Sequence, residues 1–467
     1  MNTDVLVVGA GPTGLALALD LARRGVSALV VEKAEGLFPG SRGKGIQPRT
    51  MEVLDDFGVL DAVRAAGAPY PVGMIWQDGE RAGEHRLFEA GEPTESEPFQ
   101  GPWMVPQWRT QEILFTRLRE LGGEVAFGRE LVGIAQDADG VTARFASGAP
   151  VRARYAVASD GGRSAVRRAL GIGMTGETVD PQPMLVADVR LTGLDRENCH
   201  VFPPTGDQGF MAAWPLPGTE DFQLIAQFEE GTVPDLSLDG IRKLVATRSH
   251  LAADAVTEVR WASDFRPRAA MADRFRQGRV FLAGDAAHVH SPAGGQGLNT
   301  SVQDAYNLGW KLAAVLRGEA DAALLDSYEE ERLPNAAAML GLSTGVHRGE
   351  VRRGEATAQL GLGYRGCSLA VETRTDAAEG ALQAGDRAPD GVRGGVRLFD
   401  AFRGPHWTLV AVGTDLPDLP GYSLHGVRIP PYEAYGTGLF LVRPDGYVGW
   451  AGASAEGLAK YAARVGA

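Results

Sequence analysis

Glycines and an acidic side chain near the N-terminus are spaced as a dinucleotide-binding turn requires. The sequence GAGPTG at residues 9–14 lies between an apolar run at 4–8 and a helical pattern from 15 to 24. In such a turn the first glycine allows a tight bend, the second lets the backbone approach a pyrophosphate, and the third lets the helix pack on the strand. Glu32 ends the next apolar run, at the distance where a carboxylate accepts hydrogen bonds from ribose hydroxyls. The pattern predicts a dinucleotide site.

Two further segments repeat this order of apolar run, acidic residue and helical pattern. Asp160 follows the run 155–159, and Asp285 follows the run 280–283. After Asp285, a loop rich in glycine and proline at 291–297 leads into a second long helical pattern. Ligands bind at the carboxyl ends of parallel strands, and a helix N-terminus offers free N–H groups and a positive dipole. Asp285 suits a sugar-like hydroxyl better than a phosphate, because like charges repel. We therefore expect the three turns to meet around one ligand.

The elements that position these turns indicate an α/β fold with an inserted sheet. The apolar runs are short and continuous, as buried parallel strands are. Residues 184–228 instead alternate between apolar and polar positions, which predicts an antiparallel sheet with one covered face. This sheet would form a roof over the substrate. Its expected pocket residues are Trp76, Phe210, Trp214 and Gln223.

Composition narrows the class of protein further. The chain has 467 residues, 44% of them hydrophobic and 22% charged, which is typical of a soluble protein of two or three domains. Its net charge of −13 argues against nucleic acid or an anionic membrane as a partner. Two distant cysteines, Cys199 and Cys367, exclude a disulfide framework. His288 and His290 form no metal-ligand cluster with them, so we expect no metal. With no signal peptide or membrane-spanning run, the sequence predicts a cytoplasmic enzyme.

Together the three turns resemble those of the group A flavoprotein monooxygenases, the single-component aromatic hydroxylases. The tail from Gly385 resembles the thioredoxin-like C-terminal domain of phenol hydroxylase and of bacterial hydroxylases of aromatic polyketides and rifampicin. This tail lacks a CxxC pair, so we expect it to pack rather than to carry out redox chemistry. The resemblance implies a Rossmann-type, glutathione-reductase-like FAD-binding domain with an inserted antiparallel-sheet substrate domain and a small thioredoxin-like domain. The expected boundaries are 1–175 and 271–350 for the FAD-binding domain and its helices, 176–270 for the substrate domain, 351–384 for a linker and 385–467 for the thioredoxin-like domain.

The same resemblance assigns roles to individual residues. Leu298 and Asn299 would offer backbone N–H groups to the pyrimidine edge of the flavin, and Pro292 would place its carbonyl beside the reacting edge of the substrate. Independently of the resemblance, the basic segment 41–52 indicates that Lys44 lies in a solvated loop. The residues assigned to the cofactor are Gly9, Gly11, Thr13, Gly14, Glu32, Lys33, Arg42, Gln107, Leu131, Asp160, Asp285, Gly297, Leu298 and Asn299.

The implied chemistry belongs to the cofactor. NADPH or NADH would reduce FAD, dioxygen would add at flavin C4a as a hydroperoxide, and one oxygen atom would pass to an electron-rich aromatic carbon. An apolar, aromatic roof favours a phenolic or polycyclic, polyketide-like substrate, as in antibiotic biosynthesis. Two alternatives stay open: Baeyer–Villiger-type oxygenation of a related ketone or quinone, and a non-catalytic flavin-binding regulator. A halogenase would carry a WxWxIP motif, which the sequence lacks. Whether the protein is a monomer or a homodimer also stays open.

Overall fold

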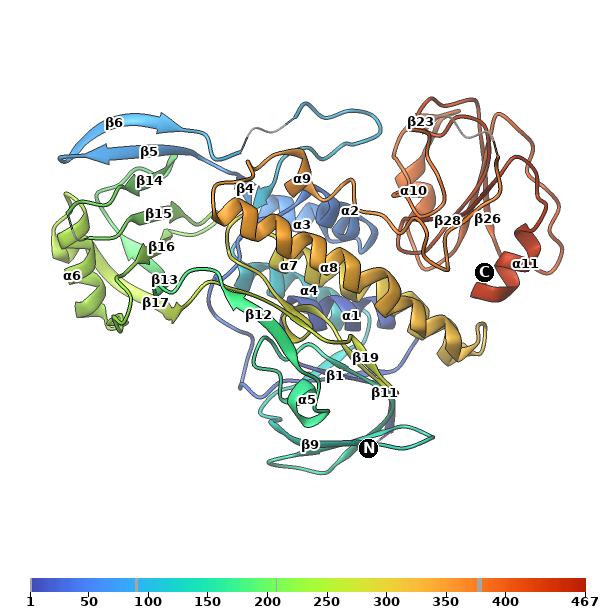
Figure 1. The fold of residues 1–467 in the computed structure, drawn as a ribbon, viewed down its shortest axis with the longest axis horizontal. Coiled ribbons are helices and arrows are strands. Elements are labelled where there is room, and N and C mark those ends of the chain that lie inside the picture. The colour runs from blue at the N-terminus through green and yellow to red at the C-terminus, as the bar shows by residue number, and fades with distance from the viewer. Residues whose placement is uncertain (1, 89–90, 207, 376–379) are drawn as a thin grey trace.

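An eight-stranded sheet lies between the two ends of the computed structural model, at the bottom of the view in Figure 1. The structure describes residues 2–88, 91–206, 208–375 and 380–467. Its main path runs β19-β20-β11-β1-β2-β8, and β10 and β9 continue from β11. The strands are β1 (Asn2–Val8), β2 (Ala28–Val31), β8 (Glu124–Ala126), β9 (Leu131–Gln136), β10 (Val141–Phe145), β11 (Val151–Ala158), β19 (Arg276–Gln277) and β20 (Val280–Leu282).

Parallel pairing brings the ends of the three predicted apolar runs to one edge of this sheet. β1 pairs in parallel with both β11 and β2, and β11 pairs in parallel with β20. The four residues that end β1 and the three that form β20 are all buried, as strands covered on both faces require. The turns that follow β1, β11 and β20 therefore leave the sheet side by side.

Helices cover the eight-stranded sheet and pack closely against one another beside the three turns. Gly309 of the long helix after the third turn approaches the first helix so closely that a Cβ there would lie 2.1 Å from Asp20 Oδ2. In the described part of the chain, no helix has the length and apolar character needed to cross a bilayer. The helices of this unit are α1 (Pro12–Arg23), α2 (Pro48–Asp56), α3 (Leu60–Ala65), α4 (Gln107–Glu120), α5 (Ala165–Ala169), α7 (Gly297–Arg317) and α8 (Asp326–His347).

A seven-stranded sheet with the order β17-β13-β16-β15-β14-β5-β6 lies at one end of the molecule (Figure 1). Helix α6 (Leu238–Arg248) packs on one face through Ile241 and Val245. β5 and β6 join this sheet although they precede the expected domain boundary at residue 176. The strands are β5 (Val72–Gln77), β6 (Glu80–His85), β13 (Met184–Leu191), β14 (Asn198–Phe202), β15 (Met211–Pro215), β16 (Asp221–Gln227) and β17 (Val256–Phe265).

Two small sheets join the seven-stranded sheet to the central unit. β12 (Met174–Thr178) and β18 (Arg268–Ala272) pair antiparallel as the chain enters and leaves the inserted sheet, and β21 (His288–Val289) pairs with β18. The other small sheet has the order β3-β7-β4. Its strands are β3 (Gly45–Ile46), β7 (Trp103–Met104) and β4 (Ala68–Pro69).

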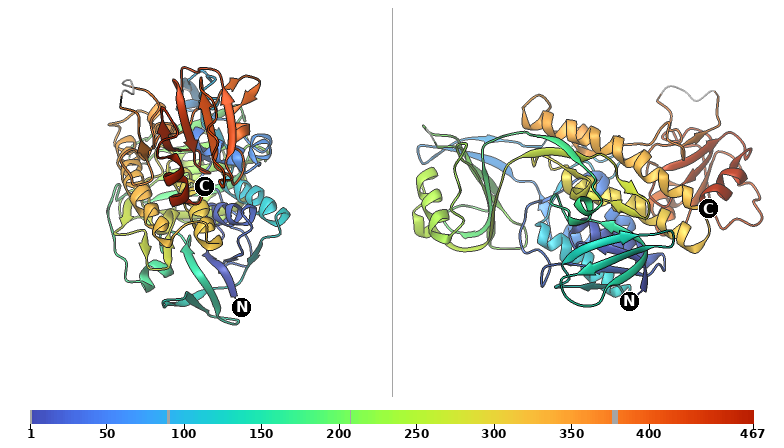
Figure 2. Two further views of the ribbon diagram at one scale, coloured as in Figure 1. Left: turned by 90° about the vertical axis from the view of Figure 1, so that its right-hand side faces the viewer. Right: turned by 60° about the horizontal axis from the view of Figure 1, so that its bottom comes forward.

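The C-terminal unit lies at the opposite end, and α8 begins beside it and runs away from it along the central unit (Figure 2). Its five-stranded sheet has the order β22-β28-β27-β25-β26, and β22 comes from the segment expected to be a linker. One buried apolar cluster includes residues of both units, among them Leu312 and Trp450. The elements are α9 (Glu355–Ala358), β22 (Val371–Glu372), β23 (Val392–Arg393), β24 (Val396–Arg397), α10 (Leu398–Phe402), β25 (Thr408–Val412), β26 (His425–Ile429), β27 (Gly438–Val442), β28 (Val448–Gly452) and α11 (Leu458–Val465).

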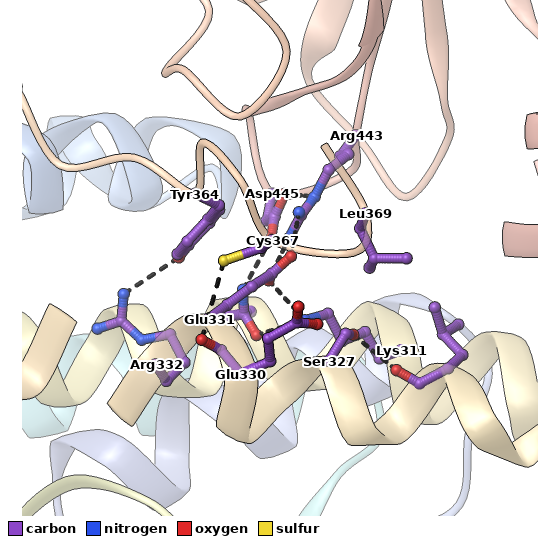
Figure 3. Close-up of polar contacts among 12 residues, drawn as sticks. Lys311, Ser327, Glu330, Glu331, Arg332, Tyr364, Cys367, Leu369, Arg443 and Asp445 are labelled. Carbon is purple, nitrogen blue, oxygen red and sulfur yellow. Dashed lines mark hydrogen bonds and ion pairs between the residues drawn. The ribbon is translucent and has the colours of Figure 1, made fainter. Parts of the chain in front are cut away.

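A buried ionic cluster joins the C-terminal unit to the central unit (Figure 3). Glu331 on α8 accepts hydrogen bonds from Arg443 Nη1 at 2.6 Å and from Lys311 Nζ at 2.6 Å. Arg443 also donates to Asp445 at 2.6 Å. The Glu331, Arg443 and Lys311 side chains are 0% exposed. Buried charges are stable only when each one is paired, and here two cations meet two anions.

Candidate active site

The structure brings the three predicted turns into contact. Gly9 in the first turn has a φ of +106°, and a Cβ there would lie 2.4 Å from the carbonyl oxygen of Ser159, which ends the second run. A Cβ on Gly284, in the third turn, would lie 2.5 Å from Thr13 Oγ1 in the first. Only glycine tolerates such a close approach. The three turns therefore form one continuous surface at the carboxyl edge of the sheet.

The first turn fits an anionic pyrophosphate. A Cβ on Gly14 would lie 2.0 Å from Gly9 O, so this glycine is required for helix packing, whereas a Cβ on Gly11 would meet no atom within 4 Å. Gly11 is the N-cap of α1, where no side chain of the described residues caps the helix and no acidic residue lies in the first turn. Free N–H groups, open space and a helix dipole together make an anion site.

Glu32 is held against the glycine turn. Its Oε2 accepts the backbone N–H of Ala10 at 2.9 Å, so the carboxylate sits against the glycine turn. Its backbone oxygen accepts the N–H of Arg129 at 2.8 Å, which brings the start of β9, and with it Leu131, to the same end of the site. The Lys33 side chain next to it is exposed. The predicted ribose and adenine residues are therefore neighbours.

The two aspartates of the other turns have different surroundings. Asp160 Oδ2 accepts the N–H of Ala165 at 2.7 Å, while its buried Oδ1 has no hydrogen-bond partner within the described chain and is free for a ligand. The Asp285 side chain is exposed, yet enough protein surrounds it that desolvation raises its pKa, with His288 and Arg42 partly offsetting the effect. Such a carboxyl group can bind a ribityl hydroxyl.

The segment containing Arg42 lies over the N-terminus of α7. Gln107 Oε1 accepts the N–H of Gly43 at 2.9 Å, and a Cβ on Gly43 would lie 3.3 Å from Leu298 Cδ1. Asn299 Oδ1 accepts the N–H of Gln47 at 2.8 Å. No side chain of the described residues caps α7, so its first N–H groups stay available to a flavin edge.

The glycine-rich loop before α7 has left-handed backbone. Gly294 and Gly295 have φ values of +85° and +67°, a conformation that glycine adopts without strain. Pro292 is exposed on this loop, and its carbonyl oxygen accepts the Gly295 N–H at 3.3 Å. Gly297 begins α7 and is half-buried. The predicted flavin and substrate contacts of the loop are thus adjacent in space.

A row of polar and aromatic side chains crosses the inner face of the seven-stranded sheet. Asp188 pairs with Trp261 on one side and Gln223 on the other, and Gln223 pairs with Trp214. Lys44 donates a hydrogen bond to Gln223 Oε1, and its Nζ lies 4.6 Å from the centre of the Trp214 ring. The expectation of a solvated Lys44 is therefore wrong: the side chain is half-buried, and burial lowers its pKa to about 8. Sequence reasoning missed Asp188 and Trp261, because only the strand register aligns them, and it missed Lys44, because only the fold brings its loop onto Gln223 and Trp214.

The four expected pocket residues do not all share this face. Phe210 packs in the same small apolar cluster as Trp214. Trp76 packs with the cluster on the α6 face instead. Its Nε1 donates to His200 Nδ1 at 3.0 Å, and its ring lies 4.2 Å from that of His250. The structure therefore separates Trp76 from Phe210, Trp214 and Gln223.

Asp188 gives a direct test of this row. Burial raises its pKa to about 6, with Ser41 and Lys44 partly offsetting the rise. A carboxyl group whose pKa is higher in the folded protein than in the unfolded chain destabilises the fold once it is ionised. This destabilisation develops as the pH rises from the unfolded-state pKa to the folded-state pKa. We expect Asp188→Asn to stabilise the fold by roughly 1–3 kcal/mol at pH 8 and by much less at pH 4. Urea unfolding at both pH values measures this difference. The exposed Asp254→Asn is the control, and an equal effect of both substitutions would contradict the account.

Comparison with known proteins agrees with the geometry. The family model described as FAD binding domain matches residues 2–343. A flavin-dependent monooxygenase of Mycobacteroides abscessus is 48% identical over 475 residues, which cover 99% of each chain. This chain belongs to the FAD-binding flavoprotein monooxygenases. A rifampicin monooxygenase of Streptomyces venezuelae is 35% identical over 96% of this chain and 95% of its own. The crystal structure of aklavinone-11 hydroxylase, a ternary complex with FAD and aklavinone, matches with a TM-score of 0.82 and 31% identity over 99% of this chain and 98% of that chain.

FAD is thus the cofactor of this monooxygenase, and its residues fit the group. The anion site at α1, the free Asp160 oxygen, the exposed Asp285 carboxyl and the uncapped start of α7 each offer a polar group that the described chain leaves without a partner. Among the described residues no three His, Cys, Asp or Glu side chains gather as metal ligands would.

Proposed function

We propose that this monooxygenase uses NAD(P)H and dioxygen to hydroxylate a phenolic or polycyclic aromatic, polyketide-like substrate. The observation that carries the proposal is the row of Trp214, Gln223 and Lys44, which lies next to the segment that covers the start of α7. Aromatic walls bind a flat ring system, and a buried ammonium binds a phenol oxygen or its anion. The names of the relatives, rifampicin monooxygenase and aklavinone-11 hydroxylase, support the same substrate class.

The protein's own part in this chemistry is binding, orientation and charge. When bound, FAD would supply the redox chemistry that couples NAD(P)H and dioxygen to the transfer of one oxygen atom. In our proposal Gly11 and Thr13 line the pyrophosphate, and the N–H groups of Leu298 and Asn299 stabilise negative charge on the pyrimidine edge, where the dipole of α7 adds to the effect. The Pro292 carbonyl lies at the reacting edge of the substrate.

The remaining cofactor contacts in the proposal follow the site from one end to the other. Glu32 and Lys33 bind the adenosine ribose, Leu131 packs on adenine, and Arg42 and Gln107 reach the phosphate and ribityl region. The division of the chain is also part of the proposal: 1–175 and 271–350 bind FAD, and 176–270 with β5 and β6 form the roof. Residues 351–384 form a linker whose strand β22 joins the C-terminal sheet, and 385–467 form a thioredoxin-like unit. The parallel pair β25–β26 followed by antiparallel β27 and β28 supports that last assignment.

Purified protein tests the proposal. We expect a yellow protein that retains FAD and consumes NAD(P)H faster when a phenolic polycycle is added, giving a product one oxygen atom heavier. FAD-free protein is the control and should consume none. A product with an expanded ring would instead identify Baeyer–Villiger chemistry. FAD binding without any substrate-stimulated NAD(P)H consumption would identify a regulator and contradict the proposal.

A further inference from the structure

The segment after α8 contacts the start of α7 through Gln359, a residue with unusual backbone geometry. Gln359 has a φ of +64°, a left-handed conformation that only one other non-glycine residue, Asp78, adopts in the described ranges. The Gln359 side chain is 2% exposed. A residue with a β-carbon adopts this conformation at an energetic cost, so its surroundings must hold it there.

Hydrogen bonds of the Gln359 side-chain amide keep the backbone in this conformation. Its Nε2 donates to Gln296 Oε1 at 2.6 Å and to Thr300 Oγ1 at 3.2 Å. Its Oε1 accepts from Gln303 Nε2 at 2.5 Å. All three partners belong to α7 or its N-cap, and none is more than 3% exposed. Hydrogen bonds between buried amides are costly to break, because water cannot replace the lost partner.

Gln296 connects Gln359 to the glycine-rich loop by hydrogen bonds. Its Nε2 donates to Gly294 O at 2.8 Å and to Thr357 O at 3.2 Å, so both amide hydrogens and the oxygen of Gln296 are engaged. Thr357 belongs to the same segment as Gln359. Two residues that follow α8 therefore hold the N-cap of α7, and Gln47 Nε2 donates to the same Gly294 carbonyl oxygen at 3.2 Å.

We propose that Gln359, outside the matched FAD-binding region of residues 2–343, is a positioning residue for the flavin. It holds Gln296, and thereby fixes the loop and the free N–H groups of Leu298 and Asn299. The inference rests on the proposed position of the flavin at these groups. A loop held less firmly binds FAD more weakly and stabilises the reduced, anionic flavin less, because preorganised donors lose their alignment.

The test compares FAD dissociation constants and flavin reduction potentials of the full-length protein and its variants. We expect Gln359→Ala to raise the FAD dissociation constant by about tenfold or more, since it leaves Gln296 Oε1 without its donor. The reduction potential should become more negative. Gln359→Gly removes the backbone cost but also the side chain, so it should bind FAD as weakly as Gln359→Ala while unfolding at a higher temperature. The double variant Q296A/Q359A should bind FAD no more weakly than whichever single variant binds it more weakly, because the two residues act through one contact.

Gln136→Ala is the matched control. Gln136 also uses its amide twice, accepting from Arg279 N at 2.8 Å and donating to Gln277 O at 3.1 Å, but in the strands β9 and β19 rather than beside α7. Gln136→Ala should lower the stability of the protein and leave its FAD dissociation constant within about twofold of the wild-type value. If Gln359→Ala fails to fold, Gln359→Gly carries the test. Wild-type affinity and potential in the Gln359 variants would overturn this inference alone, whereas a wild-type protein that binds no FAD would overturn the proposed function.

Discussion

Gly11→Ala is expected to weaken FAD binding by about a hundredfold or more while leaving the stability of the FAD-free protein unchanged. The backbone φ of Gly11 is −71°, which alanine adopts freely, and a Cβ there would meet no protein atom within 4 Å. In the proposed site, the same Cβ would occupy the open space in front of the N–H groups of α1, where we place the pyrophosphate. A methyl group in that space removes charge-assisted hydrogen bonds, which are the strong ones.

Gly14→Ala is the matched control for this effect. Its Cβ would lie 2.0 Å from Gly9 O, so the first helix must shift away from its strand. We therefore expect Gly14→Ala to destabilise the FAD-free protein as well as to lose FAD. Isothermal titration with FAD and thermal unfolding of the FAD-free form separate the two cases. A Gly11→Ala protein that binds FAD like the wild type would show that the pyrophosphate lies elsewhere.

Glu331→Gln is expected to produce the largest loss of stability, roughly 3–5 kcal/mol in the free energy of unfolding. The substitution keeps the volume of the side chain but leaves Lys311 and Arg443 with only Asp445 as a counter-charge in a fully buried site (Figure 3). A buried charge without its partner costs far more than an exposed one, because water cannot solvate it. The C-terminal unit should lose its firm attachment to α8.

Urea unfolding at pH 7 measures the effect, and Glu120→Gln is the control. Glu120 pairs with Arg117 at 2.8 Å, but both side chains are exposed, so its loss should cost less than about 1 kcal/mol. An equal loss in both variants would contradict the account of the cluster.

The same cluster predicts a pH dependence of stability. Burial alone would raise the pKa of Glu331, but Arg443 and Lys311 outweigh burial and lower the pKa to about 2. A carboxyl group with a lowered folded-state pKa stabilises the fold above its unfolded pKa, and this contribution disappears as the pH falls toward the folded value. Wild-type stability should therefore fall more steeply below pH 4.5 than that of Glu331→Gln.

Sequence reasoning reached the nucleotide turns because their signal is local. The glycine spacing, the helix that follows and Glu32 all lie within one strand–helix–strand unit, and parallel pairing of β1 with β2 places Glu32 beside the turn. The other two turns repeat the same local order, so parallel strands bring them to the same edge. The antiparallel pairing within residues 184–228 was also predicted correctly. The expectation of one covered face was wrong, because β13 and β15 are buried on both faces, and β5 joins the sheet in parallel.

Features set by distant pairing could not be predicted in this way. β5 pairs with β14, far along the chain, and a register shift between Ile75 and Trp76 accompanies the turn of Trp76 away from the substrate face. Lys44 lies in a short basic loop, and its contacts with Trp214 and Gln223 in the folded protein remove it from water. Glu331 belongs to a charged helical segment typical of a solvated face, and the C-terminal unit buries it.

Gln359 shows the same limit in a segment without periodicity. Nothing in its neighbourhood indicates a left-handed backbone, and its amide partners come from α7, more than one element away. Its place in the site is therefore visible only in the assembled fold.

The most direct test of the whole account is mass spectrometry of the product formed under oxygen-18 gas. The FAD-loaded protein is supplied with NAD(P)H and a phenolic polycycle that stimulates NAD(P)H consumption. The account predicts one oxygen-18 atom in the hydroxylated product, and no product from the Gly11→Ala protein without bound FAD. Product oxygen that comes from water, or product formed equally well without FAD, would contradict it.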